Sequence, residues 1–213
     1  MKGLFITLEG IDGSGKSTQA ARLKERLEAA GWRVVHTREP GGTALGRVIR
    51  EQFLASGAAE IDPITELLLM AADRAHHVET VIRPALERGE AVVCERYTDS
   101  TEAYQGYGGG VPLDAVRRVN ELATGGLAPH LTFLLDLEPA QAVRRWSRGP
   151  DRVESRGEAF YRRVREGYLR IAEACPGRVR VIDASLPPGD VEARIVGHLA
   201  EAGAAREGGA VSR

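Results

Sequence analysis

The amino-acid sequence predicts an α/β fold in which a five-stranded parallel sheet carries helices on both faces. Short apolar runs rich in β-forming residues alternate with long stretches of helical periodicity. Each short run is nearly continuous in apolar residues, as expected of strands that are buried on both faces. A glycine-rich segment follows the first run directly and precedes a helical pattern. The expected strands are residues 3–8, 33–37, 91–95, 130–136 and 178–183.

Glycine and proline mark the ends of the helices that connect these strands. The first helix is expected to begin near Lys16 and to end at Gly31, because glycine commonly follows the last helical turn. The next begins at Asp62-Pro63, an N-cap followed by proline at the first helical position. It runs towards Gly89 and is expected to bend before Pro84. Four further helices are expected: two opening at Pro112 and Pro139, and two covering residues 157–174 and 188–202.

Length and composition predict one domain. The chain has 213 residues, of which 43% are hydrophobic, and a formal net charge of −1. Such a length is enough for a full hydrophobic core, so we assign residues 1–203 to a single domain and expect residues 204–213 to fray. Since acidic and basic residues balance, nucleic-acid binding is not expected.

The length of the apolar runs and the number of cysteines indicate the cellular compartment of the protein. No apolar run approaches the ~20 residues that span a bilayer, so we expect a cytoplasmic protein with no membrane partner. The chain has two cysteines, Cys94 and Cys175, and neither stands at metal-binding spacing from other cysteines or histidines. We therefore expect two reduced thiols.

The glycine-rich segment is a complete phosphate-binding loop. It has Gly10, four further residues, and then Gly15-Lys16-Ser17, between an expected strand and an expected helix. Glycines allow consecutive backbone N–H groups to turn towards a polyphosphate, and the following helix points its positive end at the same place. Lys16 can reach the β- and γ-phosphates, and Ser17 can ligate Mg²⁺. The segment therefore predicts binding of a nucleoside triphosphate.

Other residues limit the class of protein. A GTPase needs an Asn-Lys-x-Asp segment to read guanine, but the only asparagine lies in Val-Asn120-Glu-Leu. An ATPase motor usually follows its second acidic strand with another acid, whereas the strand at 91–95 continues Glu95-Arg96-Tyr97. An arginine at the carboxyl end of a strand beside the triphosphate suits a second substrate that carries a phosphate.

Four segments support a two-substrate site: Arg38-Glu39-Pro40-Gly41-Gly42, Ala71-Ala72-Asp73-Arg74, Ser100–Gly106, and the arginine-rich residues 144–156. Four motifs resemble the thymidylate kinase family in their order and spacing: the phosphate loop, the Arg-Glu-Pro-Gly-Gly segment, the Glu95-Arg96-Tyr97 triplet and the Ala-Tyr-Gln-Gly run. The resemblance covers about residues 3–200. The resemblance implies a three-layer P-loop kinase fold with a small lid at about residues 144–156. It also implies ATP and dTMP as substrates, Mg²⁺ as cofactor, dTDP and ADP as products in dTTP biosynthesis, and a homodimer.

The resemblance implies roles for residues around the donor nucleotide. Lys16 would hold the ATP phosphates, Ser17 and Glu95 would serve the metal, and Arg144 would stack on adenine. Asp12 would face the 3′-hydroxyl of dTMP or the Mg²⁺ water, and Glu95 stands where the family more often has aspartate. The residues expected to bind ATP are Gly10, Ile11, Asp12, Gly13, Ser14, Gly15, Lys16, Ser17, Thr18 and Arg144.

Roles around the acceptor follow in the same way. Arg96 would clamp the dTMP phosphate with Arg38 nearby, and Arg74 would donate to thymine O4, which excludes cytosine. Tyr104 would pack against C2′ of the sugar, and Met70 stands where the family usually has a phenylalanine on thymine. The residues expected to bind dTMP are Arg38, Glu39, Arg50, Met70, Arg74, Arg96, Thr101, Tyr104 and Gln105.

The catalytic arginine is expected in the lid. One branch of the family carries this arginine in the phosphate loop, but here the position is Gly13. Arg152 and Arg148 are the candidates, with Arg152 first because it lies in Asp-Arg-Val-Glu. Three alternatives remain: a kinase for dUMP or for a deoxynucleoside, a nucleotide-gated binding protein without transfer activity, and a nucleic-acid binder. Neither of the last two needs a second phosphate clamp or an arginine-rich lid.

Overall fold

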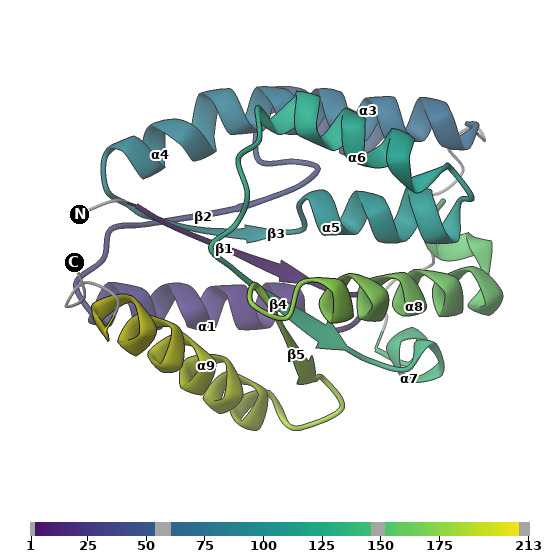
Figure 1. The fold of residues 1–213 in the computed structure, drawn as a ribbon. Helices are drawn as coiled ribbons and strands as arrows, with labels where there is room; N and C mark the ends of the chain where they lie inside the picture. Colours follow the sequence, from purple (N-terminus) through teal and green to yellow (C-terminus); the bar gives the residue numbers. More distant parts are fainter. Residues whose placement is uncertain (1–2, 54–60, 146–151, 209–213) are drawn as a thin grey trace.

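The computed structural model describes residues 3–53, 61–145 and 152–208, and its strands form a single parallel sheet (Figure 1). The order in the sheet is β2-β3-β1-β4-β5. The strands are β1 Leu4–Glu9, β2 Val34–Arg38, β3 Ala91–Glu95, β4 Leu131–Asp136 and β5 Val179–Asp183. The predicted five-stranded parallel sheet is therefore confirmed, with each boundary within one residue of the expectation.

Helices cover both faces of the sheet. The α-helices are α1 Lys16–Ala29, α2 Ala44–Phe53, α3 Pro63–His77, α4 Arg83–Glu87, α5 Thr98–Thr101, α6 Leu113–Thr124, α7 Pro139–Val143, α8 Glu158–Ala174 and α9 Pro188–Gly208. Two π-helical segments, η1 Val78–Ile82 and η2 Glu102–Gly108, and a short 3₁₀ turn, η3 Glu154–Arg156, complete the elements. Helices α1 and α9 lie below the sheet in Figure 1, whereas α3, α4 and α6 lie above it.

Capping residues place the helices where the sequence predicts them. Gly31 follows α1 with a φ of 89°, and the Trp32 N–H donates back to the Leu27 carbonyl, which closes the last turn. The Asp62 side chain accepts hydrogen bonds from the N–H groups of Ile64 and Thr65 and so caps α3. These contacts confirm both predicted helix ends.

The bend expected before Pro84 takes the form of a π-helical segment. Elements α3, η1 and α4 follow one another without a break, and Pro84 lies in the first turn of α4. Proline has no N–H to donate, so the backbone widens locally just before it. Three features differ from the expectation: α9 continues to Gly208, and neither α2 nor the helical segment from α5 to η2 was predicted.

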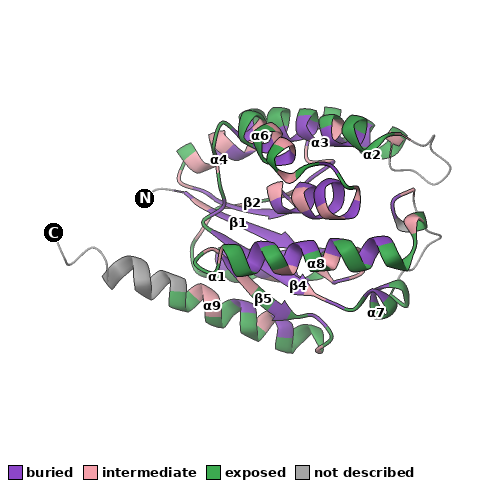
Figure 2. Ribbon diagram, turned by 45° about the vertical axis from the view of Figure 1, so that its right-hand side comes forward, coloured by how far each residue is buried: buried purple, intermediate pink, exposed green. Residues whose placement is uncertain are grey.

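The core is built on alternating sides of the central strand. Phe5 packs with Val92 and Tyr97, whereas Ile6 and Leu8 pack in the cluster that contains Leu23 of α1. In Figure 2 the inner strands β1, β3 and β4 are almost wholly buried, whereas the outer helices are buried on the side that faces the sheet and exposed on the other. None of the described helices is long and apolar enough to cross a membrane.

The order of the strands determines where a site can form. Strand β1 lies in the middle of the sheet, hydrogen-bonded to β3 on one side and to β4 on the other. Ligands of such sheets bind outside the carboxyl ends of the strands, at the point where the order reverses. The phosphate loop lies at that point, directly after β1.

Candidate active site

The phosphate loop takes a backbone shape that its glycines permit. Gly10, Gly13 and Gly15 have positive φ values of 132°, 84° and 94°. At Gly10 a side chain is also excluded by space, because a Cβ atom would lie 2.4 Å from the Leu135 carbonyl oxygen. The loop ends at Lys16, where α1 begins, so the positive end of the helix faces the loop.

Lys16 is folded into this loop. Its ammonium group donates to the carbonyl oxygens of Gly10 and Ile11 at 2.9 and 2.8 Å. Burial and the positive charge of Arg96 lower the pKa of Lys16 to about 7, although Asp12 and Glu95 oppose this shift. The lysine therefore lies where it can exchange two backbone carbonyls for phosphate oxygens.

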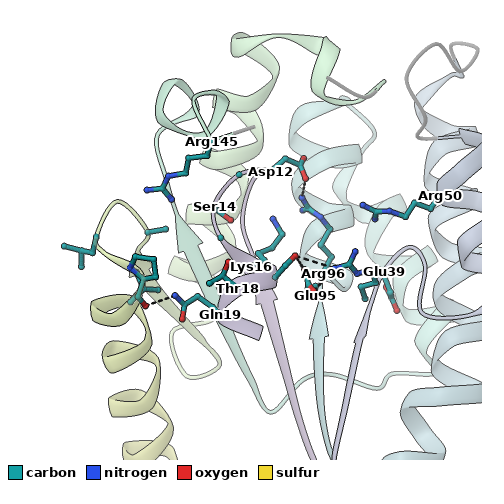
Figure 3. A pocket seen from close by; sticks show the side chains of 18 residues that line it. Asp12, Ser14, Lys16, Thr18, Gln19, Glu39, Arg50, Glu95, Arg96 and Arg145 are labelled. Carbon is teal, nitrogen blue, oxygen red and sulfur yellow. Dashed lines mark hydrogen bonds and ion pairs between the residues drawn. The ribbon is translucent and has the colours of Figure 1, made fainter. Parts of the chain in front are cut away.

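Two adjoining cavities open around the loop. The larger has a volume of about 740 Å³ and is shown in Figure 3. It is lined by the loop residues from Asp12 to Gln19 and by Arg38, Glu39, Arg50, Glu95, Arg96, Arg145, Ala184, Leu186, Pro188 and Val191. The smaller has a volume of about 100 Å³. It is lined by Asp12, Glu39, Pro40, Arg50, Glu66, Met70, Asp73, Arg74, Arg96, Ser100, Thr101, Tyr104, Gln105 and Val153.

The two cavities share a wall formed by Asp12, Glu39, Arg50 and Arg96. The lining of the larger cavity includes the phosphate loop and the apolar side chains of Ala184, Leu186, Pro188 and Val191. In Figure 3 the labelled loop residues lie in the middle of the cavity, with Glu39 and Arg50 to one side. The cavity can hold a nucleotide with its phosphates on the loop and its base against the apolar wall.

Arg96 has an unusual backbone conformation at this wall. Its φ of 69° is the only positive value among the described residues that are not glycine. The conformation is held in part by Glu9 at the end of β1, which accepts from the Tyr97 N–H and the Ser100 hydroxyl at 2.7 and 2.6 Å. Backbone strain of this kind is concentrated at functional sites.

The guanidinium group of Arg96 joins the phosphate loop to the smaller cavity. It donates to Asp12 at 2.5 Å, to the Gly10 carbonyl at 3.0 Å and to the Tyr104 hydroxyl at 3.1 Å. Tyr104 and Tyr161 also donate to Asp12, at 2.8 and 3.0 Å. Although burial opposes it, the positive charges of Arg96 and Lys16 hold the pKa of Asp12 well below its usual range.

Ser17 and Glu95 bring two hard oxygen atoms together beside the loop. The Ser17 hydroxyl donates to the Glu95 carboxylate at 2.5 Å, and Arg38 and His36 contact the other carboxylate oxygen at 2.9 and 3.2 Å. Burial opposes ionisation of Glu95, but these hydrogen bonds outweigh it and lower the pKa of Glu95 to about 2. A carboxylate and a hydroxyl suit a hard divalent cation such as Mg²⁺.

Arg74 is held rigidly in the wall of the smaller cavity. It is 2% exposed and donates to Glu39, Thr101, Asn120 and the Tyr97 carbonyl at 2.6–2.9 Å. These bonds use four of its five N–H groups, and the remaining one, on Nη2, has no partner among residues 3–53, 61–145 and 152–208. Arg74 therefore has one donor left for a ligand. The His77 ring in turn contacts Glu39 at 2.8 Å.

The structure brings the expected acceptor residues together. Glu39, Arg50, Met70, Arg74, Arg96, Thr101, Tyr104 and Gln105 all line the smaller cavity. Arg38 lines only the larger one, where it is paired with Glu95. Of the expected donor residues, Asp12 to Thr18 line the larger cavity, whereas Gly10 and Ile11 contribute the carbonyls that Lys16 contacts.

The arginine-rich segment differs most from the expectation. Arg148 lies outside the described residues. Arg152 donates to Glu66 at 2.7 Å and to the Phe53 carbonyl at 2.8 Å, and it does not line the larger cavity. Arg145, and not the expected Arg144, lines the donor cavity. These two arginines are adjacent in the sequence, so the sequence alone did not show which of them lines the cavity.

Two acidic residues were missed by the sequence analysis. Glu66 is buried and accepts from Gln105, Arg152 and Arg156. Asp73 is buried without a hydrogen-bond partner among the described residues, and burial together with the charge of Glu39 raises its pKa to about 6. Glu66, Met70 and Asp73 follow one another at intervals of four and three residues on α3, which is the spacing of a buried helix face. Acidic residues at this spacing were the signal that could have identified Glu66 and Asp73.

Comparisons with known proteins agree with this geometry. Residues 8–195 match the family model described as thymidylate kinase. A thymidylate kinase from Deinococcus radiodurans is 52% identical over 204 residues, covering 95% of this chain and 98% of that protein. One from Pelotomaculum thermopropionicum is 50% identical over 188 residues, covering 87% of each. The crystal structure of thymidylate kinase from Ehrlichia chaffeensis superposes with a TM-score of 0.76 at 35% identity, covering 93% of this chain and 99% of that one.

Proposed function

This chain belongs to the thymidylate kinase family, and we propose from that premise how its own residues carry out the reaction. The reaction transfers the γ-phosphoryl group of ATP to dTMP, which gives dTDP and ADP for dTTP biosynthesis. The chain is thus an ATP-dependent phosphotransferase. The observation that supports the following assignment is the pair of cavities that share Asp12 and Arg96.

We assign the larger cavity to ATP. The loop N–H groups and Lys16 hold the phosphates, while Arg145 and the apolar wall at Leu186 and Pro188 hold the base. Phosphoryl transfer depends mainly on positioning and on neutralising the charge that develops on the transferred group. Lys16 supplies one such charge when it leaves the carbonyls of Gly10 and Ile11.

We assign the smaller cavity to dTMP. Arg96 lies at the shared wall and clamps the acceptor phosphate, because it lines both cavities. Arg74 offers its remaining N–H to the thymine edge, and Tyr104 closes the cavity beside the sugar. The dTMP phosphate is itself a competent nucleophile, so no strong general base is needed.

We propose that Mg²⁺ binds at Ser17 and Glu95. The ionised carboxylate and the hydroxyl lie 2.5 Å apart on the edge of the donor cavity, a donor set that fits this ion. When bound, Mg²⁺ would neutralise phosphate charge. Arg38 would give up its contact with Glu95 and turn towards phosphate oxygens, since its side chain is 42% exposed.

We keep the proposal that an arginine of segment 144–156 faces the transferred group. Gly13 supplies no charge in the phosphate loop, and an arginine at this point can contribute ~10³–10⁵ in rate. Arg148 and Arg152 are still the candidates. For Arg152 the role requires that its guanidinium group leave Glu66, which would then keep its contact with Arg156.

We also propose a homodimer that buries the outer sides of α2 and α3. The side chains Leu45, Val48, Ile64 and Leu68 are 43–55% exposed on these two adjacent helices. On α3 the apolar stripe continues through Ala72 and Ala75 at helical spacing. Apolar patches of this kind mark interfaces.

We also propose a cytoplasmic location, which agrees with the two unpaired cysteines.

Substitution of Lys16 tests the assignment of the donor cavity. We expect Lys16→Ala to lower kcat by a factor on the order of 10³ or more, because it removes the charge that balances the transferring group. Lys24→Ala is the matched control on the same helix, where Lys24 makes an exposed ion pair with Glu28. Its turnover should equal that of the wild type. Near-normal turnover of Lys16→Ala, with an unchanged thermal unfolding curve, would contradict the assignment.

A further inference from the structure

Glu66 gathers hydrogen-bond donors from two separate parts of the fold. Its side chain is 2% exposed on α3. One carboxylate oxygen accepts from the Gln105 side-chain amide of η2 at 2.7 Å. The other accepts from Arg152 at 2.7 Å and from Arg156. The carboxylate thus joins the acceptor cavity to the arginine-rich segment.

This contact determines which way the Gln105 amide faces. An ionised carboxylate can only accept hydrogen bonds, so Gln105 must turn its NH₂ group towards Glu66. The Gln105 carbonyl oxygen then makes no hydrogen bond with the described residues, and Gln105 lines the smaller cavity beside Met70 and Thr101. The amide therefore presents an acceptor to the cavity.

Two arginines hold Glu66 in this arrangement from outside the cavity. Arg152 is itself fixed by its bond to the Phe53 carbonyl at 2.8 Å. Arg156 lies over the Phe160 ring, with 4.9 Å between the guanidinium carbon and the ring centre. Both guanidinium groups donate to the same carboxylate oxygen of Glu66. Glu66 therefore stays an acceptor.

We propose that Glu66 is a positioning residue that sets base specificity through Gln105. This inference rests on the proposed assignment of the smaller cavity to dTMP. The Gln105 carbonyl accepts a hydrogen bond from the ring N3–H of thymine, and the remaining Arg74 N–H donates to the neighbouring O4. Cytosine has an acceptor at N3 and an amino group at position 4, so it opposes both groups.

The variant Glu66→Gln tests the proposal through the ratio of kcat/KM for dTMP to kcat/KM for dCMP. The new amide turns its oxygen towards the two arginines and its NH₂ towards Gln105, which reverses the Gln105 amide. The cavity then presents a donor where thymine also has a donor. We expect the ratio to fall about 10- to 100-fold, and KM for ATP to stay unchanged.

A double variant separates positioning from structural support. Glu66→Gln with Gln105→Glu exchanges the two groups, so the new carboxylate accepts from residue 66 and again presents an acceptor to the cavity. We expect the preference for dTMP to recover relative to Glu66→Gln alone. Glu66→Asp, which keeps an acceptor-only group, should lower kcat/KM for dTMP but retain the preference. Glu192→Gln is the matched control, since Glu192 also accepts from two arginines, Arg22 and Arg26.

Several outcomes would overturn the proposal. Equal losses for dTMP and dCMP in Glu66→Gln, or no recovery in the double variant, would make Glu66 a structural residue. If Glu66→Gln does not fold, Gln105→Leu decides, because it removes the acceptor and leaves Glu66 with both arginines. An unchanged ratio in that variant would contradict the inference. Failure of the wild type to prefer dTMP over dCMP would instead count against the proposed function.

Discussion

At the scale of single residues, the site is dominated by charges held out of water. Lys16 and Arg74 are buried, Arg96 is partly buried with a side chain 16% exposed, and all three donate to carboxylates, carbonyls or hydroxyls of the chain itself. Buried charges of this kind are costly when unpaired, so the protein supplies substitutes for the ligand's oxygens. The phosphates of a bound nucleotide would take the place of these protein oxygens, so the protonation state of Lys16 should change on binding.

Proton uptake on nucleotide binding tests this view of Lys16. In the nucleotide-free protein the pKa of Lys16 is lowered to about 7, and negative phosphates beside it must raise that pKa. At a pH between the lowered pKa of Lys16 in the free protein and its raised pKa in the complex, the complex binds more protons than the free protein. We therefore expect uptake of protons at about pH 8, and an affinity for a non-hydrolysable ATP analogue that falls as the pH rises above about 7.

Calorimetry in buffers of different ionisation enthalpy measures this uptake directly. The observed binding enthalpy at about pH 8 should depend on the buffer for the wild type and should lose much of that dependence in Lys16→Ala. A binding enthalpy that is independent of the buffer in the wild type would show that Lys16 remains fully protonated in the free protein.

At the scale of elements, the strands were predictable and two helical segments were not. The strands are continuous apolar runs, because parallel strands in the middle of a sheet are covered on both faces. Helix α2 was missed although Leu45, Val48, Ile49 and Phe53 stand at helical spacing, because it has only ten residues and follows the Gly41-Gly42 turn. The segment from α5 to η2 is partly π-helical and buries Asp99, Ser100, Thr101 and Gln105, which look like surface residues.

The same reasoning explains which site residues were predictable. The phosphate loop, Arg96 and Arg74 belong to motifs in which local sequence determines local chemistry. Glu66 looks like an ordinary acid in the first turn of a helix, and only tertiary contacts with Gln105 and Arg152 give it a further role. Arg152 looks like part of a lid over ATP, but in this structure its partner is on α3.

The packing of α2 on α3 offers a test at this scale. A Cβ atom at Gly46 would lie 2.1 Å from Asp73 Oδ1 and 2.8 Å from the Gly41 nitrogen. Alanine favours a helix over glycine by ~1 kcal/mol, but the overlap must move one helix or the buried carboxylate. We expect Gly46→Ala to lower the free energy of unfolding by about 1–3 kcal/mol.

Gly197→Ala is the control for this substitution, because Gly197 lies in α9 with open space around its Cβ position. It should leave stability unchanged or raise it slightly. Denaturant unfolding of both variants measures the change in the free energy of unfolding that each substitution causes. Equal stability changes at the two glycines would contradict the close packing described for Gly46.

At the scale of the whole molecule, one parallel sheet organises both substrates around the end of β1. The two cavities that we assign to ATP and dTMP share Asp12 and Arg96, and residues of α2 and α3 line the smaller one. The exposed apolar side chains Leu45, Val48, Ile64 and Leu68 on these helices line neither cavity. A dimer through this surface would therefore support the acceptor cavity from outside.

The oligomeric state tests that surface. We expect the wild type to behave as a dimer in light scattering coupled to gel filtration, and Leu68→Glu to dissociate it by placing a charge in the apolar stripe. Val196→Glu is the control, since Val196 is 37% exposed on α9 at the other side of the sheet. A wild-type monomer, or a Leu68→Glu dimer as tight as the wild type, would contradict the proposed interface.

The most direct test of the central claim is an ADP-release assay with ATP, Mg²⁺ and each of dTMP, dUMP, dCMP, dGMP and dAMP. The account predicts the highest kcat/KM for dTMP, because the Arg74 donor and the Gln105 acceptor match thymine and oppose cytosine. It predicts weaker use of dUMP, which lacks only the methyl group, and little use of dCMP and the purine nucleotides. Release of ADP at one rate whichever acceptor is present, or fastest release with a purine nucleotide, would contradict the assignment of the acceptor cavity.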